Sequence, residues 1–176
     1  METWDAIRTR RSIRKYKPLP VEEDKLARLL EVLQFAPSAK NLQPWRVILV
    51  QDPATIEKLA VACRNQKSLT QAPILLVICG QEGEAYQSMG GYWNSLAVDC
   101  SILLDELTLA ACSEGLGSCW IGAYHEEEVK AVLGIPADIR VIALTPLGYP
   151  DEEPNRRPRK ALAEVLFLER WGQGGE

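Results

Sequence analysis

The chain has 176 residues, which fits one domain, residues 1–176, with a hydrophobic core of its own. Hydrophobic residues make up 47% of it, and no apolar run approaches the roughly 20 residues that cross a membrane. The formal net charge is −4, and acidic residues predominate outside two short basic segments, which argues against a protein that binds nucleic acid over its whole surface.

The basic residues gather near the two ends of the chain. Residues 1–17 hold six basic and two acidic residues, and residues 155–160 hold four basic residues and no acidic one. The rest carries 10 basic against 22 acidic residues, a net charge of −12. Two basic segments in an otherwise acidic chain favour one shared anionic ligand, and solvated surface charge is the alternative.

The cysteines and the N-terminus indicate a reducing compartment. Five cysteines, an odd number without a CxxC pair, lie in apolar stretches, which favours buried free thiols. The first residues lack the basic start and apolar run of an export signal, so we expect a cytoplasmic protein. A single histidine, without paired cysteine ligands, argues against a zinc or iron site.

The N-terminal part begins with a short helical turn after Thr3. Residues 10–16 (Arg-Arg-Ser-Ile-Arg-Lys-Tyr) then show no helical periodicity, and Pro18 and Pro20 stop any helix. Arginine forks and a serine hydroxyl suit a phosphate group, although taken alone this pattern is more often a solvated basic loop.

A helix is predicted from Pro20 to about Ala36, because Pro37 cannot continue it. The loop 37–45 that follows contains serine, asparagine and glutamine, which could contact the polar edge of a ring ligand or satisfy a turn. Further along the chain we predict a strand over 46–51, a helix over 52–63 and a second buried strand over 72–79.

The longest helix is predicted over 92–114, roughly 34 Å long, after a mobile loop or short helix over 81–91. Its apolar residues recur four and three positions apart at Trp93, Ala97, Cys100, Leu104, Leu107 and Ala111. Leucines and isoleucines also lie outside this seam, so more than one face must be covered. We therefore expect both a central core helix and the main contact of a subunit interface.

The C-terminal part contributes the remaining elements. Glycines 115, 117 and 122 permit close backbone approach, but they form no GxGxxG fingerprint because Trp120 occupies the third position. We expect an extended stretch over 118–123, a helix over 126–133 capped by His125, a strand over 140–147 and a short element over 162–171, with 173–176 frayed. The order predicts an α+β, three-layer α/β/α domain with a mixed, mostly antiparallel sheet.

Four segments in this order resemble the nitroreductase family of FMN-dependent oxidoreductases. They are residues 10–14, 36–45, 110–122, and 147–150 together with 157–160. The resemblance implies a homodimer with the long helix at its interface and two FMN sites, each lined by both chains. The flavin is then the anion that the two basic segments share.

The resemblance also implies a role for individual residues. Arg10, Arg11 and Ser12 would hold the flavin phosphate and ribityl chain, with Arg14 nearby and Arg157 and Arg159 closing on the same phosphate. The segment with Pro37, Ser38, Ala39 and Asn41 would come from the partner subunit and contact the flavin ring. Asn65 would meet the pyrimidine edge, with Lys67 a further candidate. Trp120, Ile121 and Gly122 would lie along the isoalloxazine and direct backbone N–H groups at its reactive edge.

The implied chemistry belongs mainly to the flavin, which takes hydride from NADH or NADPH and passes two electrons to a nitro, quinone or related small-molecule acceptor by a ping-pong mechanism. Accordingly we assign no acid–base or nucleophilic residue. The alternatives are a specialised member that consumes flavin or removes halogen, and a flavin carrier or sensor without turnover. A nucleic-acid binder is a third possibility, which the acidic remainder of the chain argues against.

Overall fold

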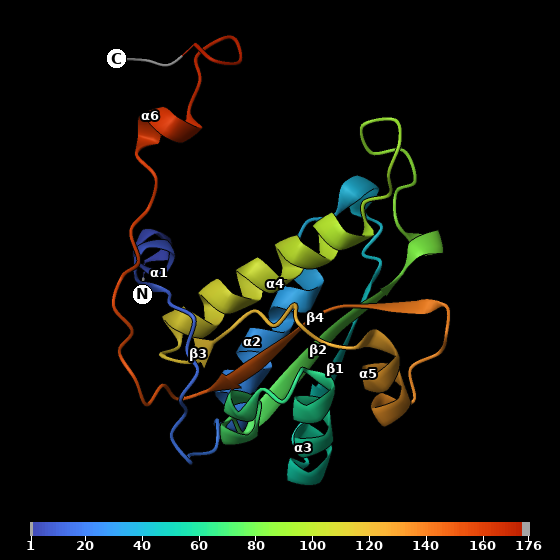
Figure 1. The fold of residues 1–176 in the computed structure, drawn as a ribbon, viewed down its shortest axis with the longest axis vertical. Coiled ribbons are helices and arrows are strands. Elements are labelled where there is room, and N and C mark those ends of the chain that lie inside the picture. Colours follow the sequence, from blue (N-terminus) through green and yellow to red (C-terminus); the bar gives the residue numbers. More distant parts are fainter. Residues whose placement is uncertain (1, 174–176) are drawn as a thin grey trace.

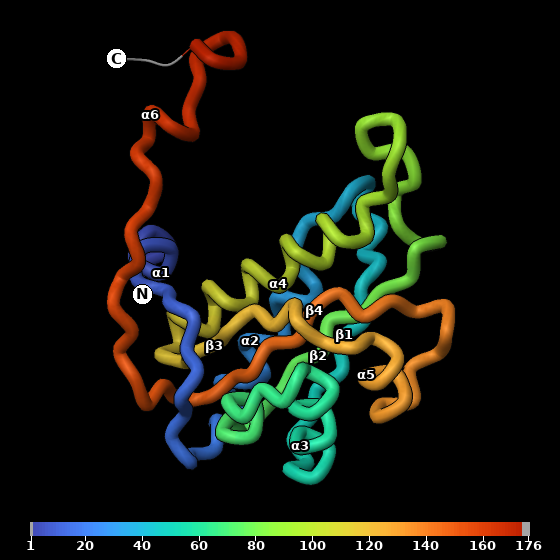
Figure 2. Tube along the Cα trace, viewed as in Figure 1, coloured from blue at the N-terminus to red at the C-terminus, as the bar shows by residue number. Residues whose placement is uncertain are grey.

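The structure is a computed structural model that describes residues 2–173, so most of the segment expected to fray, 173–176, lies outside the described residues. Figure 1 and the tube in Figure 2 show the elements in the predicted order. The helices are α1 (Thr3–Thr9), α2 (Glu23–Phe35), α3 (Pro53–Ala62), α4 (Leu96–Ser113), α5 (Glu126–Leu133) and α6 (Leu162–Val165), with 3-10 turns η1 (Ala39–Asn41), η2 (Lys67–Gln71) and η3 (Glu82–Glu84). The strands are β1 (Trp45–Val50), β2 (Ile74–Gln81), β3 (Gly117–Ser118) and β4 (Ile139–Gly148).

The four strands form one sheet in the order β1-β2-β4-β3, and every pair of named strands is antiparallel. An isolated parallel bridge between Ser12 and Ser118 brings the N-terminal basic segment to the β3 edge. The prediction of a mixed, mostly antiparallel sheet is confirmed.

Helices cover both faces of this sheet, which confirms the three layers (Figure 1). Side chains alternate between the faces of a strand, so neighbouring residues of β2 enter different cores. Leu75 and Val77 pack with residues of α3 and α5, whereas Leu76 packs with α2 and α4 and Ile78 with α4. The unbroken apolar runs of β2 and β4 therefore reflect burial on both sides, as predicted.

The long helix α4 begins at Leu96, four residues later than predicted. Gly90 and Gly91 adopt positive φ angles of 60° and 84°, and the Asn94 side chain accepts a hydrogen bond from the Leu96 N–H at 3.1 Å. The chain therefore turns over 88–95, where Trp93 continues the apolar spacing without being helical. An asparagine ahead of an apolar run is a helix-start signal that the spacing concealed.

One face of α4 is buried and the other is accessible. Cys100, Leu104, Leu107 and Ala111 of the predicted seam are fully buried. The outer face lines an open groove of about 610 Å³ with the Trp120 side chain. Its residues are Ala97, Val98, Ser101, Ile102, Asp105 and Glu106. The seam prediction is thus confirmed for its last four members, and Ala97 lies on the accessible face.

Other predictions concern single residues. His125 occupies the N-cap position of α5, but it makes no side-chain cap hydrogen bond, so the predicted capping role is wrong for its imidazole. All five cysteines are free, four are buried, and burial raises the pKa of the Cys63 and Cys100 thiols to about 12. Within residues 2–173, no helix is both long and apolar enough to cross a membrane.

Candidate functional site

The N-terminal basic segment is fixed along the β3 edge of the sheet. The Ile13 N–H donates to the Ser118 carbonyl at 2.9 Å, and the Lys17 N–H donates to the Tyr149 carbonyl at 2.9 Å. The Asp151 N–H returns a bond to the Lys15 carbonyl at 2.9 Å. These bonds give residues 10–17 an extended path with a defined orientation, although their sequence has no strand periodicity.

The C-terminal basic segment meets the N-terminal one in a shared cavity of about 1220 Å³. Seven of the lining residues are arginines and none is acidic: Arg8, Arg10, Arg11, Arg14, Arg156, Arg157 and Arg159. Ser12 lines the same cavity, with Trp4 and Ile7 of α1 on its wall. Sequence ends more than 140 residues apart thus form one strongly positive site, which we call the arginine cavity.

The arginines of this cavity keep most of their donors for a ligand. Arg11 is held in place locally, since its Nη1 donates to the carbonyls of Arg8 at 2.9 Å and Arg10 at 2.8 Å. Arg14 donates from Nη1 to the Ser12 carbonyl at 3.5 Å. Among the described residues, none of the seven forms an ion pair with a carboxylate. Glu152 lies nearby, but its carboxylate accepts from the backbone N–H groups of Arg14 and Lys15. Converging guanidinium groups that form no ion pair with a carboxylate suit a phosphate dianion.

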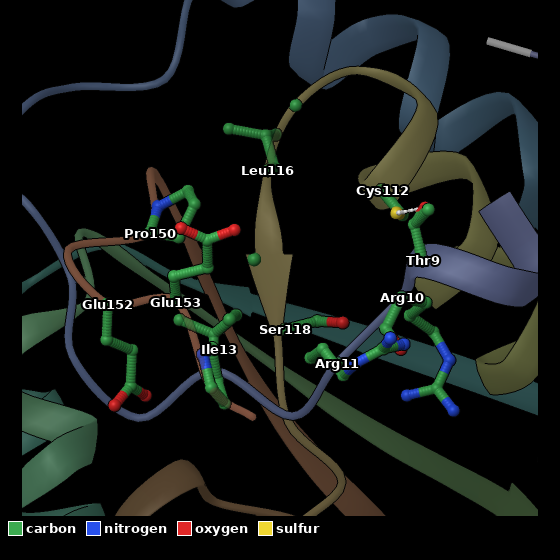
Figure 3. A pocket seen from close by; sticks show the side chains of 13 residues that line it. Thr9, Arg10, Arg11, Ile13, Cys112, Leu116, Ser118, Pro150, Glu152 and Glu153 are labelled. Atoms are coloured by element: carbon green, nitrogen blue, oxygen red, sulfur yellow. Dashed lines mark hydrogen bonds between the residues drawn. The ribbon is translucent and has the colours of Figure 1, made fainter. Parts of the chain in front are cut away.

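A smaller cavity of about 340 Å³ continues from the arginine cavity toward the end of α4 (Figure 3). Arg10 and Arg11 line both cavities, and Cys112, Leu116 and Ser118 form part of the inner wall. Gly117 is required here, because a Cβ atom would lie 2.7 Å from Cγ1 of Ile13. The predicted close backbone approach is confirmed at this glycine.

The segment 120–122 follows closely after β3, the strand whose Ser118 contacts the N-terminal basic segment. The Ile121 N–H donates to the Leu144 carbonyl at 2.8 Å, and the Leu144 N–H donates back at 3.1 Å. Ile121 is also buried in the core, so the predicted donation of its N–H to a flavin is wrong: the sheet uses that group. Trp120 is partly exposed beside α4, and Gly122 is exposed.

The residue after Asn65 contacts Ala123, directly after this segment. Asn65 follows α3, and both Arg64 and Asn65 adopt positive φ angles, 57° and 58°. The next residue, Gln66, donates from Nε2 to the Ala123 carbonyl at 3.3 Å. The structure therefore gathers three of the four predicted groups along one path: the arginine cavity, 120–122 and Asn65.

The fourth predicted group, residues 37–41, lies elsewhere in the same chain. The Ala39 N–H donates to Oδ1 of Asp99, in the first turn of α4, at 2.9 Å. By contrast, Thr9, beside the arginine cavity, contacts Cys112 in the last turn, with 3.7 Å between Oγ1 and Sγ. The 18 residues of α4 put about 27 Å between these ends. One chain alone does not bring residues 37–41 to its own arginine cavity.

The backbone around η1 is held in an uncommon conformation. Lys40, Asn41 and Gln43 have positive φ angles of 52°, 57° and 49°. Ser38 stabilises the turn, because its carbonyl accepts from the Asn41 N–H at 2.9 Å and its hydroxyl accepts from the Gln43 N–H at 2.9 Å. Left-handed conformations of non-glycine residues cluster at ligand-binding segments, where the surroundings hold them in place.

Sequence reasoning missed several residues of these sites. Arg8 and Arg156 line the arginine cavity although neither was assigned to it. Asp99 was also missed, although a lone carboxylate near the start of an apolar helix was a visible signal; its side chain is only 1% exposed. Within the described residues, no cluster of three or more His, Cys, Asp or Glu side chains could hold a metal ion.

Comparisons with known proteins show which family the chain matches. The model of the nitroreductase family matches residues 7–68 and 61–149. The chain is 36% identical to an NADH dehydrogenase of Thermus thermophilus, over 90% of this chain and 91% of the relative. It is 31% identical to an FMN reductase [NAD(P)H] of Bacillus subtilis, over 90% of this chain and 70% of the relative.

A solved structure has the same fold. It is the NADPH:FMN oxidoreductase of Vibrio harveyi in complex with NAD+, which superimposes with a TM-score of 0.87. The two chains are 26% identical, and the match covers 98% of this chain and 79% of that one. With the family model matching most of its length, the chain belongs to the nitroreductase family.

Proposed function

We propose that the protein is an FMN-dependent oxidoreductase that passes two electrons from NADH or NADPH to a small nitro, quinone or related acceptor by a ping-pong mechanism. The observation that carries this proposal is the arginine cavity, in which both ends of the chain present guanidinium groups to one anion. Family membership and the flavin activities named for its relatives support the same reading.

The residues present fit FMN. Its phosphate is a dianion, and the cavity offers unpaired guanidinium groups and the Ser12 hydroxyl, which form strong charge-assisted hydrogen bonds to phosphate oxygens. In this proposal Arg10, Arg11, Ser12, Arg14, Arg157 and Arg159 hold the phosphate and ribityl chain. Trp120, Gly122 and Asn65 then line the ring of the same flavin.

The protein contributes position and electrostatics rather than an acid–base pair. When bound, the flavin supplies the hydride chemistry. The chain fixes the phosphate end through Arg11, whose guanidinium is already oriented by two backbone carbonyls. The backbone N–H groups of Trp120 and Gly122 remain to polarise the ring edge, because the Ile121 N–H is used in the sheet.

We further propose that the protein is a homodimer and that residues 37–41 complete the flavin site of the partner. In each chain, this segment and the arginine cavity lie at opposite ends of α4. Two copies packed antiparallel along their outer α4 faces would place the segment of one chain near the cavity of the other.

The C-terminal arm, residues 151–173, reaches away from the sheet in Figure 1. It exposes Leu162, Val165, Leu168 and Trp171, which provide further apolar surface for a partner.

We expect purified protein to bind FMN and to show flavin absorption bands near 375 and 450 nm, as for any oxidised flavin. Anaerobic addition of NADH or NADPH should bleach the 450 nm band, and a quinone should restore it. A protein that takes up no FMN would contradict the proposal. Bound FMN that neither nucleotide bleaches would instead indicate a carrier or sensor.

Ile102→Glu is expected to weaken the dimer by at least tenfold, because it places a charge in the centre of the outer α4 face. Sedimentation velocity over a range of protein concentrations measures the change. Leu19→Glu is the matched control, since Leu19 is 48% exposed on a different surface. Equal dimer affinity in both variants would show that this face is not the interface.

We also propose that this single domain, residues 1–176, works in the cytoplasm. Its five free cysteines suit a reducing compartment.

A further inference from the structure

The turn ahead of α4 carries an exposed aromatic pair. The rings of Tyr92 and Trp93 stack with centroids 6.1 Å apart and an interplanar angle of 13°. Tyr92 is 84% exposed and Trp93 45%, so neither belongs to the core. Large apolar side chains held together at the surface are characteristic of binding sites.

The backbone beneath this pair is closed into a compact turn. The Met89 N–H donates to the Trp93 carbonyl at 2.8 Å, and the Trp93 N–H donates to the Met89 carbonyl at 3.2 Å. Gly90, at a φ of 60°, lies under the rings: a Cβ atom there would be 3.1 Å from the Tyr92 ring and 3.4 Å from Nε1 of Trp93. The two rings are therefore presented by a defined turn, which we call the aromatic turn, residues 88–93.

Buried hydrogen bonds connect the aromatic turn to the segment 37–41. The Ser95 N–H donates to the Tyr86 carbonyl at 2.8 Å, and the Ser95 hydroxyl accepts from the Tyr86 N–H at 3.1 Å. The same hydroxyl donates to Oδ2 of Asp99 at 2.6 Å, while Oδ1 of Asp99 accepts from the Ala39 N–H at 2.9 Å. Ser95 and Asp99 are fully buried, so this bridge is shielded from water.

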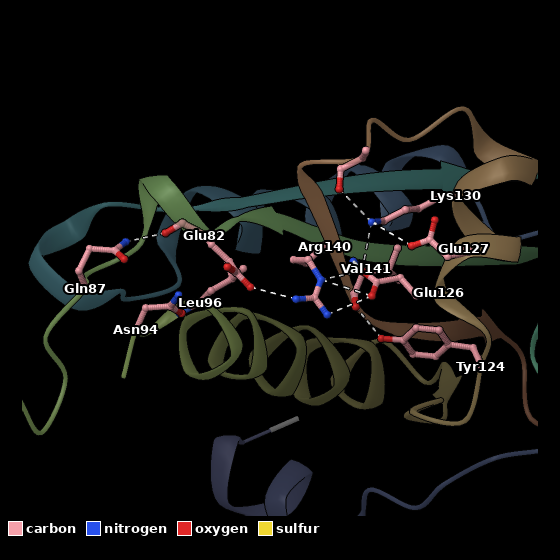
Figure 4. Close-up of polar contacts among 11 residues, drawn as sticks. Glu82, Gln87, Asn94, Leu96, Tyr124, Glu126, Glu127, Lys130, Arg140 and Val141 are labelled. Carbon is pink, nitrogen blue, oxygen red and sulfur yellow. Dashed lines mark hydrogen bonds and ion pairs between the residues drawn. The ribbon is translucent and has the colours of Figure 1, made fainter. Parts of the chain in front are cut away.

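Three further contacts hold the residues that flank the turn. The Lys40 ammonium lies 4.6 Å from the centre of the Tyr86 ring, a second link to segment 37–41. On the other side, Arg140 donates to Glu82 at 3.0 Å, and Gln87 donates from Nε2 to the Glu82 carbonyl at 2.6 Å (Figure 4). The residues immediately before the aromatic turn are thus anchored to both η1 and β4.

We propose that Tyr92 and Trp93 are specificity-determining residues that form an aromatic wall of the electron-acceptor site and favour flat aromatic acceptors. The assignment rests on the proposed function, because segment 37–41 locates the flavin ring. Asp99 is a positioning residue in this arrangement, because it fixes the aromatic wall and segment 37–41 relative to each other. The wall serves the flavin whose phosphate lies in the partner's arginine cavity. Parallel exposed rings offer a stacking surface that a flat acceptor uses and a compact inorganic ion does not.

The test compares two acceptors in the FMN-loaded protein and in a Tyr92→Ala/Trp93→Ala variant. For menadione, a flat quinone, we expect the KM to rise about fivefold to tenfold. For ferricyanide, which needs no stacking surface, we expect an unchanged KM. Without any reductant, calorimetry should show that the Kd of menadione for the oxidised protein rises by the same fivefold to tenfold, a readout independent of turnover.

A Tyr92→Phe/Trp93→Phe variant is the matched control, because it keeps two rings and should keep both KM values. Asp99→Asn keeps the shape of the side chain but replaces one acceptor oxygen with a donor, and it should raise the KM for menadione. Lys58→Ala, at an exposed position on α3, should keep both KM values. Equal changes for both acceptors, no change for either, or a weakened dimer without a KM difference would overturn the assignment. Wild-type protein that fails to bind FMN or oxidise NAD(P)H would instead refute the proposed function.

Discussion

Arg11→Ala is expected to weaken FMN binding by about tenfold to a hundredfold, which corresponds to the roughly 1.5–3 kcal/mol of a hydrogen bond to a charged group. Two backbone carbonyls already orient the Arg11 guanidinium, so little side-chain freedom is lost when a phosphate binds. Quenching of flavin fluorescence on titration of FMN with apoprotein gives the Kd. The affinity should also fall with added salt, because the contact joins opposite charges.

Lys58→Ala is the control for this experiment. It removes the same unit of charge from an exposed position on α3, outside the arginine cavity, and should leave the Kd unchanged. If Arg11→Ala and Lys58→Ala bind FMN with the same affinity as the wild type, the phosphate assignment is wrong. Equal weakening in both would point to the net charge of the chain rather than to a local contact.

Leu104→Ala is expected to lower the free energy of unfolding by about 2–5 kcal/mol, because it removes buried apolar contacts and leaves a cavity in the core. Leu104 is fully buried on the inner face of α4, in a cluster with Leu96, Cys100 and Ala143. Leu104→Asp should be worse, since a carboxylate there would have no partner, and we expect no stable folded protein. Urea unfolding monitored by circular dichroism measures the difference.

Leu19→Ala provides the matched truncation at a site that is 48% exposed, and it should change the free energy of unfolding by about 1 kcal/mol or less. A Leu104→Ala protein as stable as Leu19→Ala would mean that α4 presents a different face to the sheet. A folded, dimeric Leu104→Asp protein of normal stability would carry the same conclusion.

The sequence allowed the order of the elements and the burial of the strands to be predicted. Unbroken runs such as Ile74–Ile78 left no polar face, so covering layers on both sides followed directly. The helix start at Leu96 was harder to predict, because Trp93 fits the apolar seam. The boundary is set by one hydrogen bond, from the Leu96 N–H to the Asn94 side chain, and by positive φ angles at Gly90 and Gly91. Apolar spacing carries no information on either feature.

The candidate site was only partly predictable for a similar reason. Charge segregation indicated that the two basic segments share one anion, and the structure brings them to one cavity. Which backbone groups remain free depends on strand pairing: the Ile121 N–H was assigned to the flavin, yet it bonds Leu144, a residue 23 positions away. The role of Asp99 depends on Ala39, 60 positions distant, and no local pattern contains that contact.

The length of α4 has a consequence for how activity depends on the amount of protein. If segment 37–41 serves the partner's cavity, an isolated chain holds an incomplete flavin site, and dilution below the dimer dissociation constant should release the cofactor. By thermodynamic linkage, FMN must strengthen association by the same factor that association strengthens FMN binding. A newly synthesised chain would therefore gain its redox chemistry only on meeting a second copy.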